Sequence, residues 1–259
     1  MKKQIMILAG AIMPLAFFSC SKEKFETQET NKSMENAAAI NTSVQKPESM
    51  FFVSLNKNLE GLFEFDGNLK DKTGKLGDAV ASINGADNYT DDRKGNLNSA
   101  IKFNGRYGID IFKVPLSINT SAAAWVKFDS ISVSTNYFVR AQWLSPDFVQ
   151  ENNTLWGVIS TAATSGVASG PLNDQWHHLV ATYDGTDLKF YVDGTYIGAS
   201  QNKYPGAPYP KGSTVNYQAG YTTFPGTKTI SSVWHGSIDE LRFYSRTLSD
   251  ADVQALYLQ

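Results

Sequence analysis

The sequence predicts an all-β fold in which two antiparallel sheets pack as a sandwich, followed by one short C-terminal helix. From Phe51 onward, short apolar or alternating segments are separated by Gly, Asn, Asp and Pro, roughly every eight to twelve residues, which is typical of β-sandwiches. The chain has 259 residues, of which 42% are hydrophobic and 12% aromatic, so it can bury a large core. We therefore expect one sandwich domain over residues 51–259.

Turn residues between alternating runs locate the expected strands. Asp193-Gly194 separates two such runs, and Asp184 to Asp187 separates another pair; Asp-Gly in this setting is a strong hairpin signal. His177–Ala199 should therefore form three consecutive antiparallel strands. The expected strands are Leu62–Phe65, Ala100–Phe103, Ile109–Phe112, Ser121–Phe128, Tyr137–Arg140, Thr154–Ile159, His177–Tyr183, Leu188–Val192, Thr195–Ala199, Thr214–Ala219 and Ile238–Ser245.

A single helix is expected near the C-terminus. Ser249 can cap it, and Asp252, three residues later, can reach back in an arrangement like a capping box. Val253, Leu256 and Tyr257 would then form the apolar face of this helix.

The first residues are typical of a secretory signal peptide. Lys2 and Lys3 precede the apolar run Ile5–Phe18. A transmembrane helix needs about 20 apolar residues, so this run is too short to span a bilayer comfortably. It ends at Ser19-Cys20, and Cys20 is the one cysteine in the chain.

The segment around Cys20 resembles the lipobox of bacterial lipoproteins. This resemblance implies that residues 1–20 are a lipoprotein signal peptide and that a lipidated Cys20 anchors the protein to a membrane. The alternative is an ordinary signal peptide in which Cys20 has no role. Residues 21–50 are polar and poor in aromatic residues, so we expect a flexible tether, with a short helix over residues 33–40 as the alternative.

Four segments carry a family resemblance, and they occur in the family's order. The chain resembles the laminin-G-like jellyroll family, within the concanavalin A-like lectin/glucanase superfamily. This resemblance implies two curved antiparallel sheets whose first and last strands are adjacent, but it leaves the function open because the fold hosts lectins, adhesion modules and glycoside hydrolases. The four segments are Leu62–Asp71, Asp92–Gly105, Ala124–Lys127 with Trp176–Gly194, and Gly236–Ser249.

Charge and motif content exclude some functions. The formal net charge is −2 and there is no block of Lys or Arg, so nucleic-acid binding is not expected. Glycoside hydrolases of this fold use paired carboxylates on one strand face, and the pattern Glu-x-Asp-x-x-Glu does not occur. Asp239 and Glu240 are adjacent and should point to opposite faces, and we interpret His177 and His178 as structural. We therefore expect a protein that is not an enzyme.

The family resemblance also implies a structural calcium ion. Calcium binds six to eight oxygen atoms, which carboxylates and backbone carbonyls supply. Asp66, Asp239 and the carbonyl of Gly105 resemble the ligands of that ion. The alternative is that Asp66 and Asp239 cap turns or pair with Arg242.

Loop aromatics are the candidates for ligand binding. The loop 201–212 contains Tyr204 and Tyr209 between several prolines, which should hold these rings in place for stacking on a sugar. Trp143, Tyr221 and Phe224 are similar loop aromatics. The alternative is that these five residues fold back over the ends of the sandwich.

The favoured hypothesis is therefore a lipid-anchored cell-envelope lipoprotein, in the outer membrane of a Gram-negative bacterium, with a carbohydrate-binding domain whose partner is a polysaccharide or glycan. A structural or adhesive module with a protein partner at the cell surface is the second hypothesis. A divergent glycoside hydrolase is the third.

Overall fold

The computed structural model describes residues 55–259, except 83–87, 130–134, 142, 153, 161–163, 171–172, 205–208 and 225. The expected signal peptide with Cys20 and the expected tether, residues 21–50, lie outside the described residues. In the described part of the chain, no helix is long and apolar enough to cross a bilayer.

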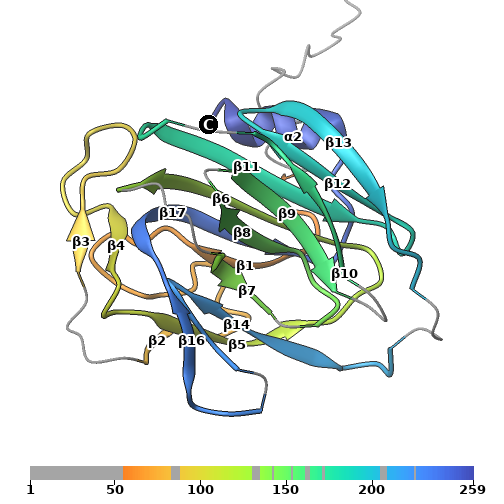
Figure 1. Ribbon diagram of the computed structural model, residues 1–259, viewed down its shortest axis with the longest axis horizontal. Coiled ribbons are helices and arrows are strands. Elements are labelled where there is room, and N and C mark those ends of the chain that lie inside the picture. The colour runs from red at the N-terminus through yellow and green to blue at the C-terminus, as the bar shows by residue number, and fades with distance from the viewer. Residues whose placement is uncertain are drawn as a thin grey trace, which may run out of the picture. The chain divides into compact units, whose positions relative to one another are not determined.

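Two large antiparallel sheets form the sandwich, as the sequence predicts (Figure 1). The eight-stranded sheet has the order β13-β12-β11-β6-β17-β4-β3, and its β1 also pairs with β17. Its strands are β1 (Leu59–Phe63), β3 (Tyr89–Thr90), β4 (Ala100–Asn104), β6 (Thr120–Phe128), β11 (Trp176–Tyr183), β12 (Asp187–Val192), β13 (Thr195–Gln201) and β17 (His235–Tyr244).

The seven-stranded sheet has the order β10-β9-β8-β7-β14-β5-β2, and a separate two-stranded sheet pairs β15 with β16. The strands of these two sheets are β2 (Val80–Ala81), β5 (Ile109–Pro115), β7 (Asn136–Arg140), β8 (Asp147–Glu151), β9 (Thr154–Ser160), β10 (Thr164–Ala168), β14 (Thr214–Ala219), β15 (Tyr221–Thr223) and β16 (Ile230–Val233).

Each expected strand is present, and the expected adjacency of first and last strands is confirmed by the β1–β17 pair. β11, β12 and β13 form the expected three consecutive strands, with Asp193 and Gly194 at positive φ in their second turn. Six strands of the structure were not predicted from the sequence: β2, β3, β8, β10, β15 and β16. Of these, β8 matters most for the candidate site.

The main core lies between the two large sheets. Trp234 is its largest fully buried side chain, and its ring stacks on Phe138 at 4.8 Å and meets Phe128 edge-on at 5.5 Å. Phe148 and Phe190 join the same core from opposite sheets. Each such side chain contributes about 1.5–3 kcal/mol by leaving water.

The helix α2 (Asp250–Tyr257) covers the outer face of the eight-stranded sheet. Ser249 and Asp252 form the predicted capping box. Val253 and Leu256 pack in a second apolar cluster with Leu59 and Tyr244 of that sheet. This sheet's outer face is therefore partly occupied by the protein's own helix.

Candidate functional site

The outer face of the seven-stranded sheet carries aromatic and polar side chains on neighbouring strands. Phe148 of β8 and Leu155 of β9 belong to the core, so the residues next to them point to the outer face. Strand register aligns Tyr137, Val149 and Trp156 across β7, β8 and β9. We call the aromatic and polar residues of this face the outer site: Asp110, Tyr137, Arg140, Asp147, Glu151, Trp156 and Gln218.

A cation–π pair stands at the centre of the outer site. The guanidinium carbon of Arg140 lies 4.0 Å from the ring centroid of Tyr137. Residues three apart on a regular strand point to opposite faces, but the register shifts between Tyr137 and Val139, and such a bulge allows both side chains to share one face. The Nε of Arg140 is buried and has no hydrogen-bond partner among the described residues.

Asp147 is a buried carboxyl at the start of β8. It is 1% exposed, and its Oδ1 accepts a hydrogen bond of 2.7 Å from the Ala141 amide. Burial raises the pKa of Asp147 to about 7, against the opposing effects of that hydrogen bond and of the Arg140 charge. Asp147 is therefore partly protonated near neutral pH.

A hydrogen-bonded polar group extends the outer site onto β14 and β5. Gln218 is opposite both Arg140 and Asp110 in the strand register. Its Oε1 accepts a hydrogen bond of 3.0 Å from the Thr223 amide, and Asp110 Oδ1 accepts one of 2.8 Å from the Tyr221 hydroxyl. These bonds fix how the amide and the carboxylate are presented.

Trp156 supplies the largest aromatic surface of the outer site. Its side chain is partly exposed, and its indole nitrogen is buried without a described hydrogen-bond partner. An added Cβ on Gly166 of β10 would lie 3.4 Å from the Trp156 ring and 3.1 Å from the Gly157 oxygen. Glycine at this position thus leaves room for the indole beside β10.

Tyr204 and Tyr209 lie together at one end of the sandwich. Their ring centroids are 5.1 Å apart and both residues are partly buried. Tyr209 lines a cavity of about 250 Å³ with the loop 116–119, and burial raises the pKa of Tyr209. The two rings contact each other, so they are less freely displayed than the sequence predicts.

The other three predicted aromatics differ from one another. Trp143 is 54% exposed and Phe224 is 53% exposed, as expected of loop residues. Tyr221 instead lies in β15 and is 5% exposed. A Cβ on Gly108 would lie 2.2 Å from the Tyr221 ring, so glycine is what admits this ring. Tyr221 supports the outer site through Asp110 and is not a displayed loop aromatic.

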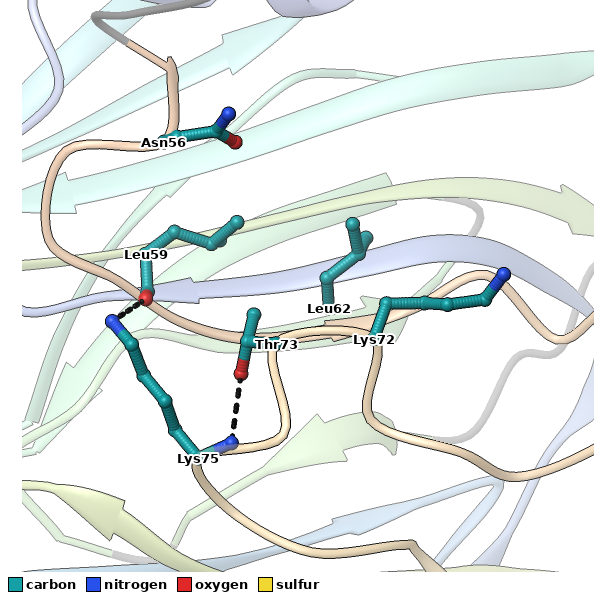
Figure 2. A pocket seen from close by; sticks show the side chains of 6 residues that line it. All are labelled: Asn56, Leu59, Leu62, Lys72, Thr73 and Lys75. Atoms are coloured by element: carbon teal, nitrogen blue, oxygen red, sulfur yellow. Dashed lines mark hydrogen bonds between the residues drawn. The ribbon is translucent and has the colours of Figure 1, made fainter.

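A second cavity, of about 250 Å³, lies beside β1. The Lys75 amine donates a hydrogen bond to the Leu59 carbonyl (Figure 2). Lys72 pairs with Glu64 at 2.7 Å and Lys75 with Glu60 at 3.8 Å, so the two amines bring little net positive charge. The lining residues are Asn56, Leu59, Leu62, Lys72, Thr73 and Lys75.

Asp239, the central residue of the expected calcium site, is bound by an arginine. Arg93 Nη1 lies 2.9 Å from Asp239 Oδ2, with the side chains 8% and 4% exposed. Arg93 Nη2 lies 2.9 Å from Glu240 Oε1, and the guanidinium lies 4.5 Å over Trp125. The expectation that Asp239 and Glu240 point to opposite faces is wrong, because Glu240 has φ of 50° at an irregularity of β17.

The three expected calcium ligands do not form one coordination sphere. Asn104, next to Gly105, is opposite His235, which precedes Asp239 by four residues, or about 13 Å along a strand. Asp66 is exposed, and its carbonyl accepts a hydrogen bond of 2.6 Å from the Asn68 amide. Calcium ligands lie 2.3–2.6 Å from the ion. The described residues contain no group of three or more His, Cys, Asp or Glu suited to a metal.

The two neighbouring histidines have structural surroundings. His178 is 1% exposed, and burial, with the charges of Arg242 and Arg93, lowers its pKa to about 3. The His177 Nδ1 lies 2.7 Å from Asp193 Oδ2. His178 is therefore neutral at physiological pH, and His177 ties β11 to the β12–β13 turn.

Comparison with known proteins bears on the fold. The Laminin_G_3 family, of the concanavalin A-like lectin/glucanases superfamily, matches residues 108–254, which is more than half of the chain. No curated protein matches the sequence. Domain 4 of AbnA, a GH43 extracellular arabinanase from Geobacillus stearothermophilus solved in complex with arabinotriose, has a TM-score of 0.61 at 23% identity, covering 77% of this chain and 98% of that one.

Two toxin binding domains share the same fold. The botulinum neurotoxin serotype D binding domain has a TM-score of 0.60 at 12% identity and covers 80% of this chain. The binding domain of Paraclostridial Mosquitocidal Protein 1 has a TM-score of 0.60 at 14% identity and covers 77%. The chain spans about half of each of these structures, 52% in both cases. The family match and the two-sheet architecture together show that the chain belongs to the concanavalin A-like lectin/glucanase superfamily.

Proposed function

We propose that this domain binds carbohydrate at the outer site without cleaving it. The observation that carries the proposal is the combination of aromatic side chains, the Tyr137–Arg140 pair and Trp156 two strands away in the same row, with the oriented polar groups of Gln218 and Asp110. Sugars present apolar C–H faces that stack on aromatic rings, and their hydroxyls bind fixed amides and carboxylates. Strands hold all of these side chains, so the site is formed before ligand arrives.

Two similar structures make a saccharide the natural ligand to test. Domain 4 of AbnA was solved with arabinotriose. Cell entry of botulinum neurotoxin type C, whose structure has a TM-score of 0.61 at 12% identity and covers 80% of this chain, depends on interaction with two ganglioside molecules. Arabinotriose and gangliosides are ligands of those two proteins. For this chain, the reason to propose saccharide binding is the set of residues in the outer site.

Carboxylate geometry supports a non-catalytic role. β8, which was not predicted from the sequence, places Asp147 and Glu151 on the same face of one strand. Four strand residues separate them by about 13 Å, whereas glycoside hydrolases hold their two carboxyl groups about 5–9.5 Å apart. Asp147 is also almost fully buried. The backbone spacing of this pair exceeds the carboxyl spacing of either hydrolytic mechanism, which supports binding without catalysis.

The N-terminal sequence supports display of the domain on a membrane. We propose that lipidation of Cys20 anchors the protein in the cell envelope, with residues 21–50 as a tether that holds the domain away from the lipid surface. The outer membrane of a Gram-negative bacterium is the compartment that fits this anchor. Saccharides of the cell surface or its surroundings would then be within reach.

A glycan array followed by titration tests the proposed function. The purified protein should bind a saccharide, and Trp156→Ala should weaken that binding about tenfold or more, because a stacking ring contributes about 1–2 kcal/mol. Tyr196→Ala is the matched control, since Tyr196 is 51% exposed on β13 of the other sheet. An array without any bound glycan would contradict the proposal and favour the adhesive alternative.

The Tyr209 cavity is the second candidate position for the same function. It brings an aromatic ring to Ser117 and Asn119, which can hydrogen-bond a sugar. If the double variant Tyr204→Ala/Tyr209→Ala loses affinity while Trp156→Ala does not, the ligand binds at this end of the sandwich and not at the outer site.

A further inference from the structure

Arg140 is the one cationic residue among those that define the outer site. It makes no ion pair with any carboxylate in the part of the chain that the structure describes. Its stacking on Tyr137 holds the guanidinium in one orientation. A guanidinium group can donate two parallel hydrogen bonds to a carboxylate. A guanidinium that is already oriented before the ligand arrives lowers the entropic cost of binding.

We infer that Arg140 binds the carboxylate of an acidic sugar, a uronate or a sialate, within the saccharide held at the outer site. This inference rests on the proposed function and adds the class of ligand. Trp156 would stack on a sugar ring of the same ligand, and Gln218 would bind its hydroxyls. Neither residue selects for charge, so Arg140 carries the selectivity.

The described carboxylates near Arg140 do not neutralise it with an ion pair, so an anionic ligand can still be attracted to it. Asp110 is two strands away on the row Arg140–Gln218–Asp110, which places it about 10 Å from Arg140. The carboxylate of Asp110 already accepts the Tyr221 hydroxyl. Glu151 lies at the other end of β8 from Asp147. Asp147 interacts with the Arg140 charge, and Glu151 acts on the Tyr137 ring on which Arg140 stacks.

Asp147 should make the affinity for an acidic ligand depend on pH, and this dependence can be measured independently of the acid–ester comparison. Because its pKa is about 7, it loses its negative charge as the pH falls from about 8 to about 6, whereas a sugar carboxylate, like other carboxylates, stays ionised above about 4. The tyrosines that interact with it, Tyr137 and Tyr217, have raised pKa values and stay neutral. An acidic ligand should therefore bind more tightly at pH 6 than at pH 8.

The test uses ligands that differ only in charge. Calorimetric titration of the purified protein compares oligogalacturonate with its methyl ester, and sialyllactose with its methyl ester. For one of the two pairs, we expect the acid to bind about tenfold more tightly than the ester, the size of effect typical of a charge-assisted hydrogen-bonded pair. The pH dependence should appear for the acid and be absent for the ester.

Variants then assign the effect to Arg140. Arg140→Gln should weaken binding of the acid about tenfold more than binding of the ester, so that the preference for the acid disappears. Arg140→Lys keeps the charge without the planar fork and should retain part of the preference. Arg106→Gln, at an exposed arginine, is the matched control and should change neither affinity. Melting temperatures of all variants show whether the fold is intact.

Different failures overturn different claims. Equal affinity of the wild type for both acids and their esters, or equal loss of acid and ester binding in Arg140→Gln, contradicts the inference; the proposed function stands if Trp156→Ala still weakens binding. Binding of neutral glycans alone also contradicts it. If no saccharide binds at all, the proposed function fails, and this inference fails with it.

Discussion

At the scale of single residues, two buried aspartates show how hydrogen bonds and burial compete. Asp71 accepts backbone amides of Leu62, Thr73, Lys75 and Leu76 at 2.9–3.0 Å. Burial raises its pKa, but these bonds prevail and the pKa falls below its usual value. Asp147 accepts one amide bond and is buried more deeply, so burial prevails there.

Replacing Asp71 should destabilise the domain. Asp71→Asn removes the negative charge that accepts hydrogen bonds from several backbone amides. We therefore expect the free energy of unfolding to fall by about 2–3 kcal/mol. Since the folded pKa of Asp71 is lowered, its contribution is present above pH 3.8 and is lost as the pH falls through the folded value. Urea unfolding measures the loss, with Asp66→Asn, at an exposed position, as the control. An equal effect of both variants would contradict this account.

Asp147 should affect stability in the opposite direction. Its folded pKa of about 7 exceeds the unfolded value of 3.8, so its contribution is present below about pH 4 and is lost as the pH rises through about 7. Between pH 5 and pH 7 this amounts to about 2 kcal/mol. Asp147→Asn should remove that part of the pH dependence in denaturant titrations. An unchanged slope would show that Asp147 is already ionised in the folded protein.

At the scale of elements, the alternating strands and the helix could be predicted because period-two patterns and capping residues are local signals. β8 was missed because the sequence Asp-Phe-Val-Gln-Glu has polar residues at both ends and follows Ser145-Pro146. The outer site could not be predicted without β8 and the bulge of β7, because these determine that Tyr137, Arg140 and Trp156 share one face. Bulges depend on pairing between strands, which no local pattern shows.

Arg93 joins the segment before β4 to β17 through its ion pairs with Asp239 and Glu240. Arg93→Met leaves Asp239 buried without its cation and leaves Glu240 with Arg242 alone, so we expect a loss of about 3–5 kcal/mol in the free energy of unfolding. Arg106→Met, on the exposed surface, should change stability by less than about 0.5 kcal/mol. Because Arg93 already supplies positive charge to Asp239, calcium and chelators should leave the melting temperature of the wild type unchanged. A calcium-dependent rise that Asp239→Ala abolishes would contradict this interpretation.

At the scale of the whole molecule, the two outer faces of the sandwich have different occupants. α2 packs on the eight-stranded sheet, whereas the seven-stranded sheet carries the outer site. The sequence predicted the sandwich. It also predicted a ligand site on loop aromatics, whereas the proposal made from the structure uses strand residues of the outer site. The proposed anchor at Cys20 would attach this domain to a membrane through residues 21–50.

Removing the thiol tests the anchor. Cys20→Ala should release the protein from the membrane fraction, because no other residue of the chain can take up the thioether-linked lipid. Metabolic labelling with a fatty-acid analogue should mark the wild type and not the variant. Equal labelling of the two proteins would show that Cys20 is not the lipidated residue.

The most direct test of the carbohydrate-binding proposal follows the tryptophan side chains during a titration with the saccharide that the array identifies. The chain has five tryptophans, so the indole N–H groups give few nuclear magnetic resonance signals, and Trp156→Phe assigns the one of interest. The account predicts that the Trp156 signal shifts in proportion to ligand occupancy, since its indole lies in the proposed site and lacks a described partner. A Trp156 signal that stays fixed at saturating saccharide, while Trp143 or residues near Tyr209 respond, would contradict it.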